Sequence, residues 1–131
     1  MIARSPAQLG VTQHGVAEQL YARGYRALSK GDAITAERCF GVLVVLEARE
    51  ERGWVGLGAA QEQQGRLGHA AAAYRLGTGF VPGSVWLRLG LGRALLRRGR
   101  LREAERAFDE AESLTSDAAL LKLIEQEREE T

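Results

Sequence analysis

The chain repeats itself with a period of 34 residues, and this period limits the fold more than any other feature of the sequence. Within each 34-residue unit, a small residue stands at position 8, glycine at position 15, alanine at position 20 and an aromatic residue at position 24. This pattern is typical of tetratricopeptide repeats, in which each unit forms two helices. The three copies are Gly24, Gly31, Ala36 and Phe40, then Gly58, Gly65, Ala70 and Tyr74, then Gly92, Gly99, Ala104 and Phe108. We therefore predict an all-α solenoid of three helix-turn-helix repeats.

The same register predicts where the helices begin and end. Gly31, Gly65 and Gly99 each follow the first helix of a repeat, where a tight turn needs a residue with positive φ. The apolar periodicity between these turns predicts helices over residues 16–29, 33–46, 51–63, 67–79, 84–97 and 101–114. A last helix over residues 117–129 starts at Asp117 as N-cap and carries an apolar stripe of Leu120, Leu121 and Ile124. This helix is predicted to cover the open end of the stack.

The domain organisation that follows is one folded unit behind a short leading segment. Residues 1–15 contain Pro6, Gly10 and Gly15 with little apolar periodicity, and they are predicted to be a flexible lead-in. Residues 16–131 form the predicted tetratricopeptide-repeat domain. Its repeats cover residues 17–50, 51–84 and 85–116, and its capping helix covers residues 117–129.

Composition argues against several classes of function. Lys and Arg number 18 and Asp and Glu 17, so no net field favours nucleic acid or a membrane surface. No apolar run approaches the ~20 residues of a membrane span, and the N-terminus has no apolar stretch of signal-peptide length. The single cysteine, Cys39, leaves no internal disulfide and suits a reducing compartment. A cytoplasmic protein is the expectation.

The residues that carry out chemistry in enzymes are sparse. His14 and His69 are far apart in the sequence, and Cys39 has no CxxC partner, so no metal site is predicted. The glycines of GLGAAQEQQG lie inside a repeat helix without a preceding strand or a GK[ST] motif, which argues against a phosphate site. No nucleophile, base and orienting group can be assembled. We predict no enzymatic activity, no cofactor and no metal.

The register also separates core residues from residues that the core does not need. Positions 4, 7, 8 and 11 of the first helix in each repeat face the second helix, so Trp54 at position 4 is predicted to be structural. Positions 2, 5, 9, 12 and 13 line the concave face once the repeats stack. These fifteen residues are Glu18, Tyr21, Tyr25, Leu28 and Ser29, then Arg52, Val55, Ala59, Glu62 and Gln63, then Trp86, Leu89, Arg93, Leu96 and Arg97.

Eight of these fifteen concave residues are apolar or aromatic, more than solvated surface requires. A contiguous apolar patch usually marks a partner surface, and Tyr and Trp are favoured anchors there. The alternative is that some of them pack against the lead-in or a neighbouring repeat. Arg93, Arg97 and Glu62 would form a polar rim that fixes the direction of a bound peptide. The predicted peptide-binding residues are Tyr21, Tyr25, Leu28, Val55, Ala59, Glu62, Gln63, Trp86, Leu89, Arg93 and Leu96.

A basic cluster surrounds the turn of the third repeat and supports a second hypothesis. It comprises Arg93, Arg97, Arg98, Arg100, Arg102 and Arg106. Such a patch could contact RNA, an acidic partner or secretion machinery. The simpler interpretation is an exposed turn balanced by the acidic residues that follow it, through pairs three or four residues apart. Nucleic-acid binding is therefore not predicted.

At these residues the chain resembles a known family. The runs EQLYARGYRALSKGD and LEAREERGWVGLGAAQEQQG, with the paired aromatics Tyr21 and Tyr25, resemble the class II chaperones of type III secretion systems. These are small SycD-like tetratricopeptide proteins, and the resemblance covers residues 16–129. It implies a bacterial cytoplasmic chaperone without enzymatic activity, which binds the extended N-terminal segment of hydrophobic translocators in its concave groove.

The resemblance also carries residue roles and one departure. It implies that Tyr21, Tyr25 and Leu28 form side-chain pockets for a proline-leucine-proline type of motif, and that Val55, Ala59, Glu62 and Gln63 continue the groove. Family members generally have a longer N-terminal extension with a dimerisation helix, whereas residues 1–15 alone precede the first repeat here. The resemblance therefore implies a possible homodimer, and the short N-terminal extension puts dimerisation through such a helix in doubt. The alternative function is a general tetratricopeptide adaptor for another bacterial assembly or regulatory partner.

Overall fold

The computed structural model describes residues 12–130, so the predicted lead-in lies outside the described residues except for residues 12–15. The described part is helical throughout, without strands. Its helices are α1 (Gln13–Ser29), α2 (Ala33–Leu46), α3 (Glu51–Gln63), α4 (Leu67–Phe80), α5 (Val85–Arg97), α6 (Leu101–Ser113) and α7 (Ala118–Glu129). The predicted all-α repeat fold is confirmed. Within residues 12–130, no helix has both the length and the apolar character that crossing a membrane requires.

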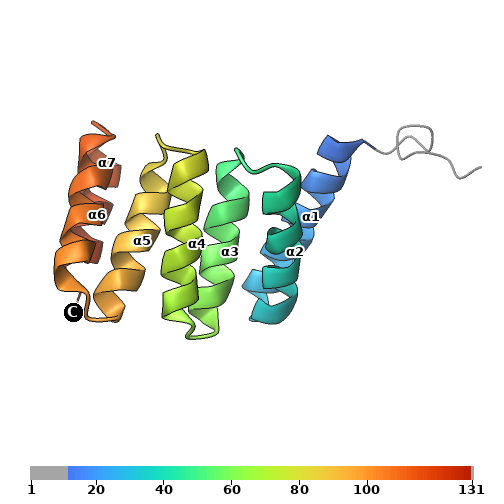
Figure 1. Ribbon diagram of the computed structural model, residues 1–131, viewed down its shortest axis with the longest axis horizontal. Helices are drawn as coiled ribbons and strands as arrows, with labels where there is room; N and C mark the ends of the chain where they lie inside the picture. Colours follow the sequence, from blue (N-terminus) through green and yellow to red (C-terminus); the bar gives the residue numbers. More distant parts are fainter. Residues whose placement is uncertain (1–11, 131) are drawn as a thin grey trace, which may run out of the picture.

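Helices α1 to α6 follow one another along the long axis in chain order, and α7 overlaps α6 in this view; each helix packs on its neighbours in sequence (Figure 1). Helices α1, α3 and α5 are the first helices of the three repeats, and α2, α4 and α6 are the second. Helix α1 begins three residues before the predicted start at residue 16, because the Thr12 hydroxyl accepts a hydrogen bond from the Gly15 amide at 2.9 Å. A side-chain N-cap of this kind satisfies a free amide of the first turn.

The turns confirm the conformation that the sequence predicted for them. Gly31, Gly65 and Gly99 have φ angles of 78°, 72° and 76°, and within residues 12–130 no residue other than glycine has a positive φ. The Asp117 side chain accepts a hydrogen bond from the Leu120 amide at 2.9 Å and so caps α7 as predicted. These local features fix the helix ends independently of what the helices pack against.

Each repeat is closed by an aromatic ring that fills the space beside a glycine. A Cβ added to Gly24 would lie 2.9 Å from the Phe40 ring, and one added to Gly92 would lie 2.7 Å from the Phe108 ring. The aromatic ring also touches the next repeat: a Cβ added to Gly90 of the third repeat would lie 2.7 Å from the Tyr74 ring of the second repeat. A close approach of this kind requires the missing side chain. The glycines therefore set the spacing of α1, α3 and α5, on which the concave face is built.

Helix α7 closes the stack at its C-terminal end, where it contacts α5 and α6 (Figure 1). Ile124 is fully buried, and Leu120 and Leu123 pack partly against the same core. Arg128 ties α7 to α6 through Asp109 at 2.6 Å and Glu112 at 3.0 Å. Trp54 is buried as predicted, and its Nε1 donates a hydrogen bond to the Ala48 carbonyl at 2.6 Å.

Candidate functional site

An open apolar pocket lies on the concave face where α1 and α3 meet, and we call it the first pocket. It encloses ≈ 320 Å³. Of the eleven predicted peptide-binding residues, it brings together six, namely Tyr21, Tyr25, Leu28, Val55, Ala59 and Trp86. Phe40, Glu51, Arg52 and Gly56 complete its lining. The repeat register therefore gathers residues from three helices, up to 65 positions apart in the sequence, at one pocket.

The two tyrosines of the first pocket differ in what holds them. Their rings stack at a centroid distance of 6.2 Å, and Tyr21 also meets the edge of Phe40. Tyr25 is 59% exposed, whereas Tyr21 is half-buried against the core formed by α1, α2 and α3. The expectation that the core does not use Tyr21 was therefore wrong, because its ring packs on the buried aromatic. Tyr25 remains free for a ligand.

A cation positions the Tyr21 ring from the other side. The Arg52 guanidinium lies 4.2 Å from the ring centroid and pairs with Glu18 at 2.5 Å and Glu50 at 2.8 Å. The hydrogen bond from Arg52 is the main cause that holds the pKa of Glu18 below its usual value. A cation over an aromatic face attracts the ring electrostatically. The sequence register placed Arg52 and Glu18 on the concave face, but neither was predicted to bind a peptide. Their spacing of 34 residues, which is one repeat, is the signal that could have shown them to be neighbours.

The concave face beyond the first pocket is filled by an ionic network. Arg93 pairs with Glu62 at 2.7 Å and with Glu127 at 3.5 Å, while the Tyr74 hydroxyl donates to Glu62 at 2.5 Å. Arg97 also reaches Glu62, at 3.1 Å. The Glu62 side chain is only 9% exposed. Glu62 and Arg93 therefore bond to each other across α3 and α5 and do not stand as an open rim.

Burial and charge act together on the groups of this network. Burial raises the pKa of the Tyr74 hydroxyl well above its ordinary value, and the Glu62 carboxylate adds to that rise. Burial by itself would lower the pKa of Arg93, but its hydrogen bonds to Glu62 and the negative charge there raise it overall. The Arg93 guanidinium therefore stays charged at physiological pH. The network links α3, α5 and α7.

The remaining predicted site residues lie outside the first pocket. Leu89 is 2% exposed and belongs to the core, so its prediction as a groove residue was wrong. Leu89 lies in the same buried cluster as Ile124 of α7, and α7 contacts α5. Leu96 packs partly against the same core. Gln63 donates from Nε2 to the Leu28 carbonyl at 3.0 Å and thus links α3 to the end of α1.

A smaller apolar pocket lies between α5 and α7, and we call it the second pocket. It encloses ≈ 280 Å³ and is lined by Trp86, Asp117, Ala119, Leu120 and Leu123. Trp86 is 48% exposed and also lines the first pocket. Its indole is therefore the wall that the two pockets share. Sequence reasoning missed the second pocket because α7 was assigned only a capping role.

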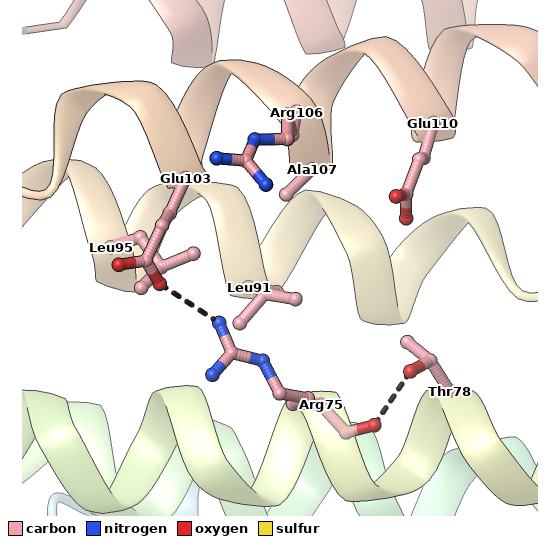
Figure 2. Close-up of a pocket in the computed structure, with 8 residues that line it drawn as sticks. All are labelled: Arg75, Thr78, Leu91, Leu95, Glu103, Arg106, Ala107 and Glu110. Atoms are coloured by element: carbon pink, nitrogen blue, oxygen red, sulfur yellow. Dashed lines mark hydrogen bonds and ion pairs between the residues drawn. The ribbon is translucent and has the colours of Figure 1, made fainter.

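A larger cleft of ≈ 540 Å³ lies on the opposite side, between α4 and α6 above α5 (Figure 2). Leu91, Leu95 and Ala107 form its floor, and Arg75 reaches across it to Glu103 at 3.2 Å. Arg106 of the basic cluster lines this cleft beside acidic side chains. Its walls carry both signs of charge, so it offers no apolar surface comparable with the first pocket.

The basic cluster of the third repeat is partly neutralised within the chain. Arg93 and Arg97 pair with Glu62, and Arg100 pairs with Glu103 at 3.3 Å. These contacts favour the simpler interpretation of the cluster. Among residues 12–130 there is no group of three or more His, Cys, Asp or Glu side chains that could hold a metal ion.

Solved structures with the same arrangement include translocator chaperones. SycD of Yersinia enterocolitica, a type III secretion chaperone solved with a peptide of the translocator YopD, is 26% identical, with 86% of this chain and 88% of that chain covered and a TM-score of 0.78. PcrH in complex with the chaperone-binding region of PopD is 26% identical, with 90% and 89% covered and a TM-score of 0.78. The predicted resemblance to type III secretion chaperones is confirmed at the level of structure.

Other comparisons speak to the fold alone or find nothing. The first tetratricopeptide domain of human RPAP3 is 16% identical, with 88% of this chain and 94% of that chain covered and a TM-score of 0.75. At that identity the match supports the tetratricopeptide fold and no function. No protein-family model matches the chain, and no curated protein matches it in sequence.

Proposed function

We propose that this protein is a chaperone of a type III secretion system, which binds the extended N-terminal segment of a hydrophobic translocator and keeps that translocator soluble and competent for export. The observation that carries the proposal is the first pocket, an open apolar site with exposed aromatic rings. It occurs in a chain whose structural neighbours include chaperones solved with translocator peptides. The first pocket is the proposed peptide site.

The chemistry of the first pocket suits an extended peptide with spaced apolar side chains. Its volume of ≈ 320 Å³ accommodates side chains and not a folded domain. Tyr25 and Trp86 offer large, rigid contact surfaces, and such residues dominate binding energy at interfaces. A proline-bearing peptide is already extended before it binds, so it loses little conformational entropy. Glu51 and Arg52 at the margin supply polar groups for the peptide backbone.

The proposal also specifies the partner of the protein and the compartment in which it acts. A translocator has to enter membranes at its destination, and its apolar segments would aggregate if they were left uncovered in the bacterial cytoplasm. The chaperone acts there by binding and requires no catalytic group. Homodimer formation is a further proposal, which the solved alternative dimer of SycD supports for that protein.

The proposal is tested by titrating the protein with two synthetic peptides, the YopD segment bound by SycD and the chaperone-binding region of PopD. Tryptophan fluorescence reports binding because Trp86 is exposed at the pocket while Trp54 is buried elsewhere. We expect saturable binding, a signal that Trp86→Phe removes, and roughly tenfold weaker binding for Tyr25→Ala. Leu76→Ala, an exposed residue on α4, is the matched control.

The alternative is a tetratricopeptide adaptor with another ligand, which is compatible with the same fold. It shares the fold and differs only in what occupies the groove. A folded helical protein that binds neither peptide would support the adaptor and reject the chaperone proposal.

A further inference from the structure

We propose that the bound segment continues past Trp86 into the second pocket, so that α7 is part of the peptide-binding surface as well as the cap of the stack. This inference rests on the proposed function and adds a second anchoring site to it. The occupant is the same extended translocator segment, which places one apolar side chain in the first pocket and another between α5 and α7. The sharing of Trp86 by the two pockets is the observation that points to it.

The two pockets have the same chemical character. The second pocket is lined by Leu120, Leu123, Ala119 and the indole of Trp86, and Asp117 is its one charged residue. Asp117 Oδ1 accepts a hydrogen bond from the Leu120 amide and so caps α7. The other four lining residues are apolar, and the ≈ 280 Å³ of the pocket accommodates one or two aliphatic side chains.

The path between the pockets is set by the ionic network. Trp86 and Arg93 are seven residues apart on α5, which corresponds to about 10 Å along the helix axis. Leu120 and Glu127 have the same spacing on α7. The concave surface of α5 and α7 thus has an apolar end, at Trp86 and Leu120, and an ionic end, at Arg93 and Glu127.

A peptide that leaves the first pocket along this face meets two different surfaces. At the ionic end it would have to cover Arg93 and Glu62 and remove water from paired charges, which costs free energy. At the apolar end it covers the Trp86 indole and two half-buried leucines, which gains free energy in proportion to the apolar area removed from water. The apolar end is therefore the route for the chain.

The test compares three peptides built on the chaperone-binding region of PopD. The first is the region alone. The second carries, at each end, a short Gly-Ser spacer followed by two leucines, and the third carries two alanines in their place. Both ends are extended because the direction of the bound segment is left free. Each peptide is titrated against the wild-type protein, Ala119→Glu and Ala118→Glu. Both substituted alanines are exposed in the first turn of α7, but only Ala119 lines the second pocket.

For the wild type we expect the leucine peptide to bind roughly tenfold more tightly than the alanine peptide. Ala119→Glu should abolish that gain, and Ala118→Glu should keep it. Equal affinities for the leucine and alanine peptides, or a gain that survives in Ala119→Glu, would overturn this inference and leave the proposed function standing. If none of the three peptides binds the folded wild type, the proposed function and this inference fall together.

Discussion

Tyr25 and Arg93 are equivalent positions of the repeat, two units apart, yet one stands beside an open pocket and the other is locked in ion pairs. Tyr25 is 59% exposed, whereas the Arg93 side chain is 24% exposed. The same contrast holds for Tyr21, which lines the first pocket, and Leu89, which is buried. The two halves of the concave face therefore differ although their backbone register is the same.

Whether a half is open depends on the neighbouring helix of the concave face, which is α3 beside α1 and α7 beside α5. Beside α1, helix α3 presents Val55, Gly56 and Ala59, which leave space for a ligand. Beside α5, helix α7 presents the equivalent positions as Leu123, Ile124 and Glu127, which pack on the core or pair with Arg93. Side-chain volume and charge at these positions thus separate the open first pocket from the buried and ion-paired part of the α5–α7 interface, because a well-packed interior leaves no room for a ligand. The second pocket lies at the Trp86 end of that interface, away from Glu127.

The largest effect is expected when α3 receives the residue of α7. Ala59→Glu places in the first pocket the side chain that α7 carries at Glu127. A peptide would then have to bury an unpaired carboxylate, so binding of the PopD region should weaken about a hundredfold, or about 2.7 kcal/mol. Fluorescence titration measures this, and Ala72→Glu on the exposed face of α4 is the control. Unchanged affinity would place the peptide elsewhere.

The second prediction tests the ionic network by removing its cation, Arg93. Arg93→Met leaves Glu62 and Glu127 without their main partner and should lower the free energy of unfolding by about 2 kcal/mol, less than for a fully buried pair because Arg93 is partly exposed. Urea unfolding followed by circular dichroism gives the value. Adding Glu62→Leu should restore most of the loss, and peptide affinity at the first pocket should stay the same. If Arg93→Met is as stable as wild type, the ionic network does not contribute to the stability of the fold.

The alanine variants of the two tyrosines in the first pocket should differ in stability. Tyr21→Ala removes a ring that packs on Phe40 and is expected to cost about 1 kcal/mol of unfolding free energy, whereas Tyr25→Ala should cost almost nothing. Thermal unfolding of each variant compares them. The double variant should keep its helicity at room temperature but melt at a lower temperature than wild type. Equal melting of the two single variants would mean that Tyr21 is as free of the core as Tyr25.

The smallest effect concerns pH. The pKa of Glu18 is lower in the folded chain than its ordinary value of 4.5, chiefly through the hydrogen bond from Arg52. Its contribution to stability is therefore complete above about pH 4.5 and is lost as the pH falls through the lowered pKa. The difference in urea midpoint between wild type and Glu18→Gln should be small at pH 7 and should shrink as the pH is lowered below 4.5. A difference independent of pH would exclude an ionic role for Glu18.

Local features of the chain were predictable because they depend on nearby residues. The turns at the three glycines depend only on the positive φ that glycine adopts there, and the N-cap at Asp117 depends only on the amide three residues further along the chain. The start of α1 was misplaced because the Thr12 cap lies in a stretch with weak apolar periodicity. Six of the eleven predicted peptide-binding residues share the first pocket, since the repeat register fixes which face of each helix they occupy.

The sequence by itself determined the repeat, the helix ends and the face on which each concave residue lies, because a 34-residue period acts through bonded geometry and helical phase. Only the tertiary structure decided which of those positions are open. Leu89 is buried, Arg93 is paired with Glu62, and Trp86 stands between two pockets. These outcomes depend on the volume and charge that adjacent helices bring from more than 30 residues away, and no local pattern records how such side chains share one space.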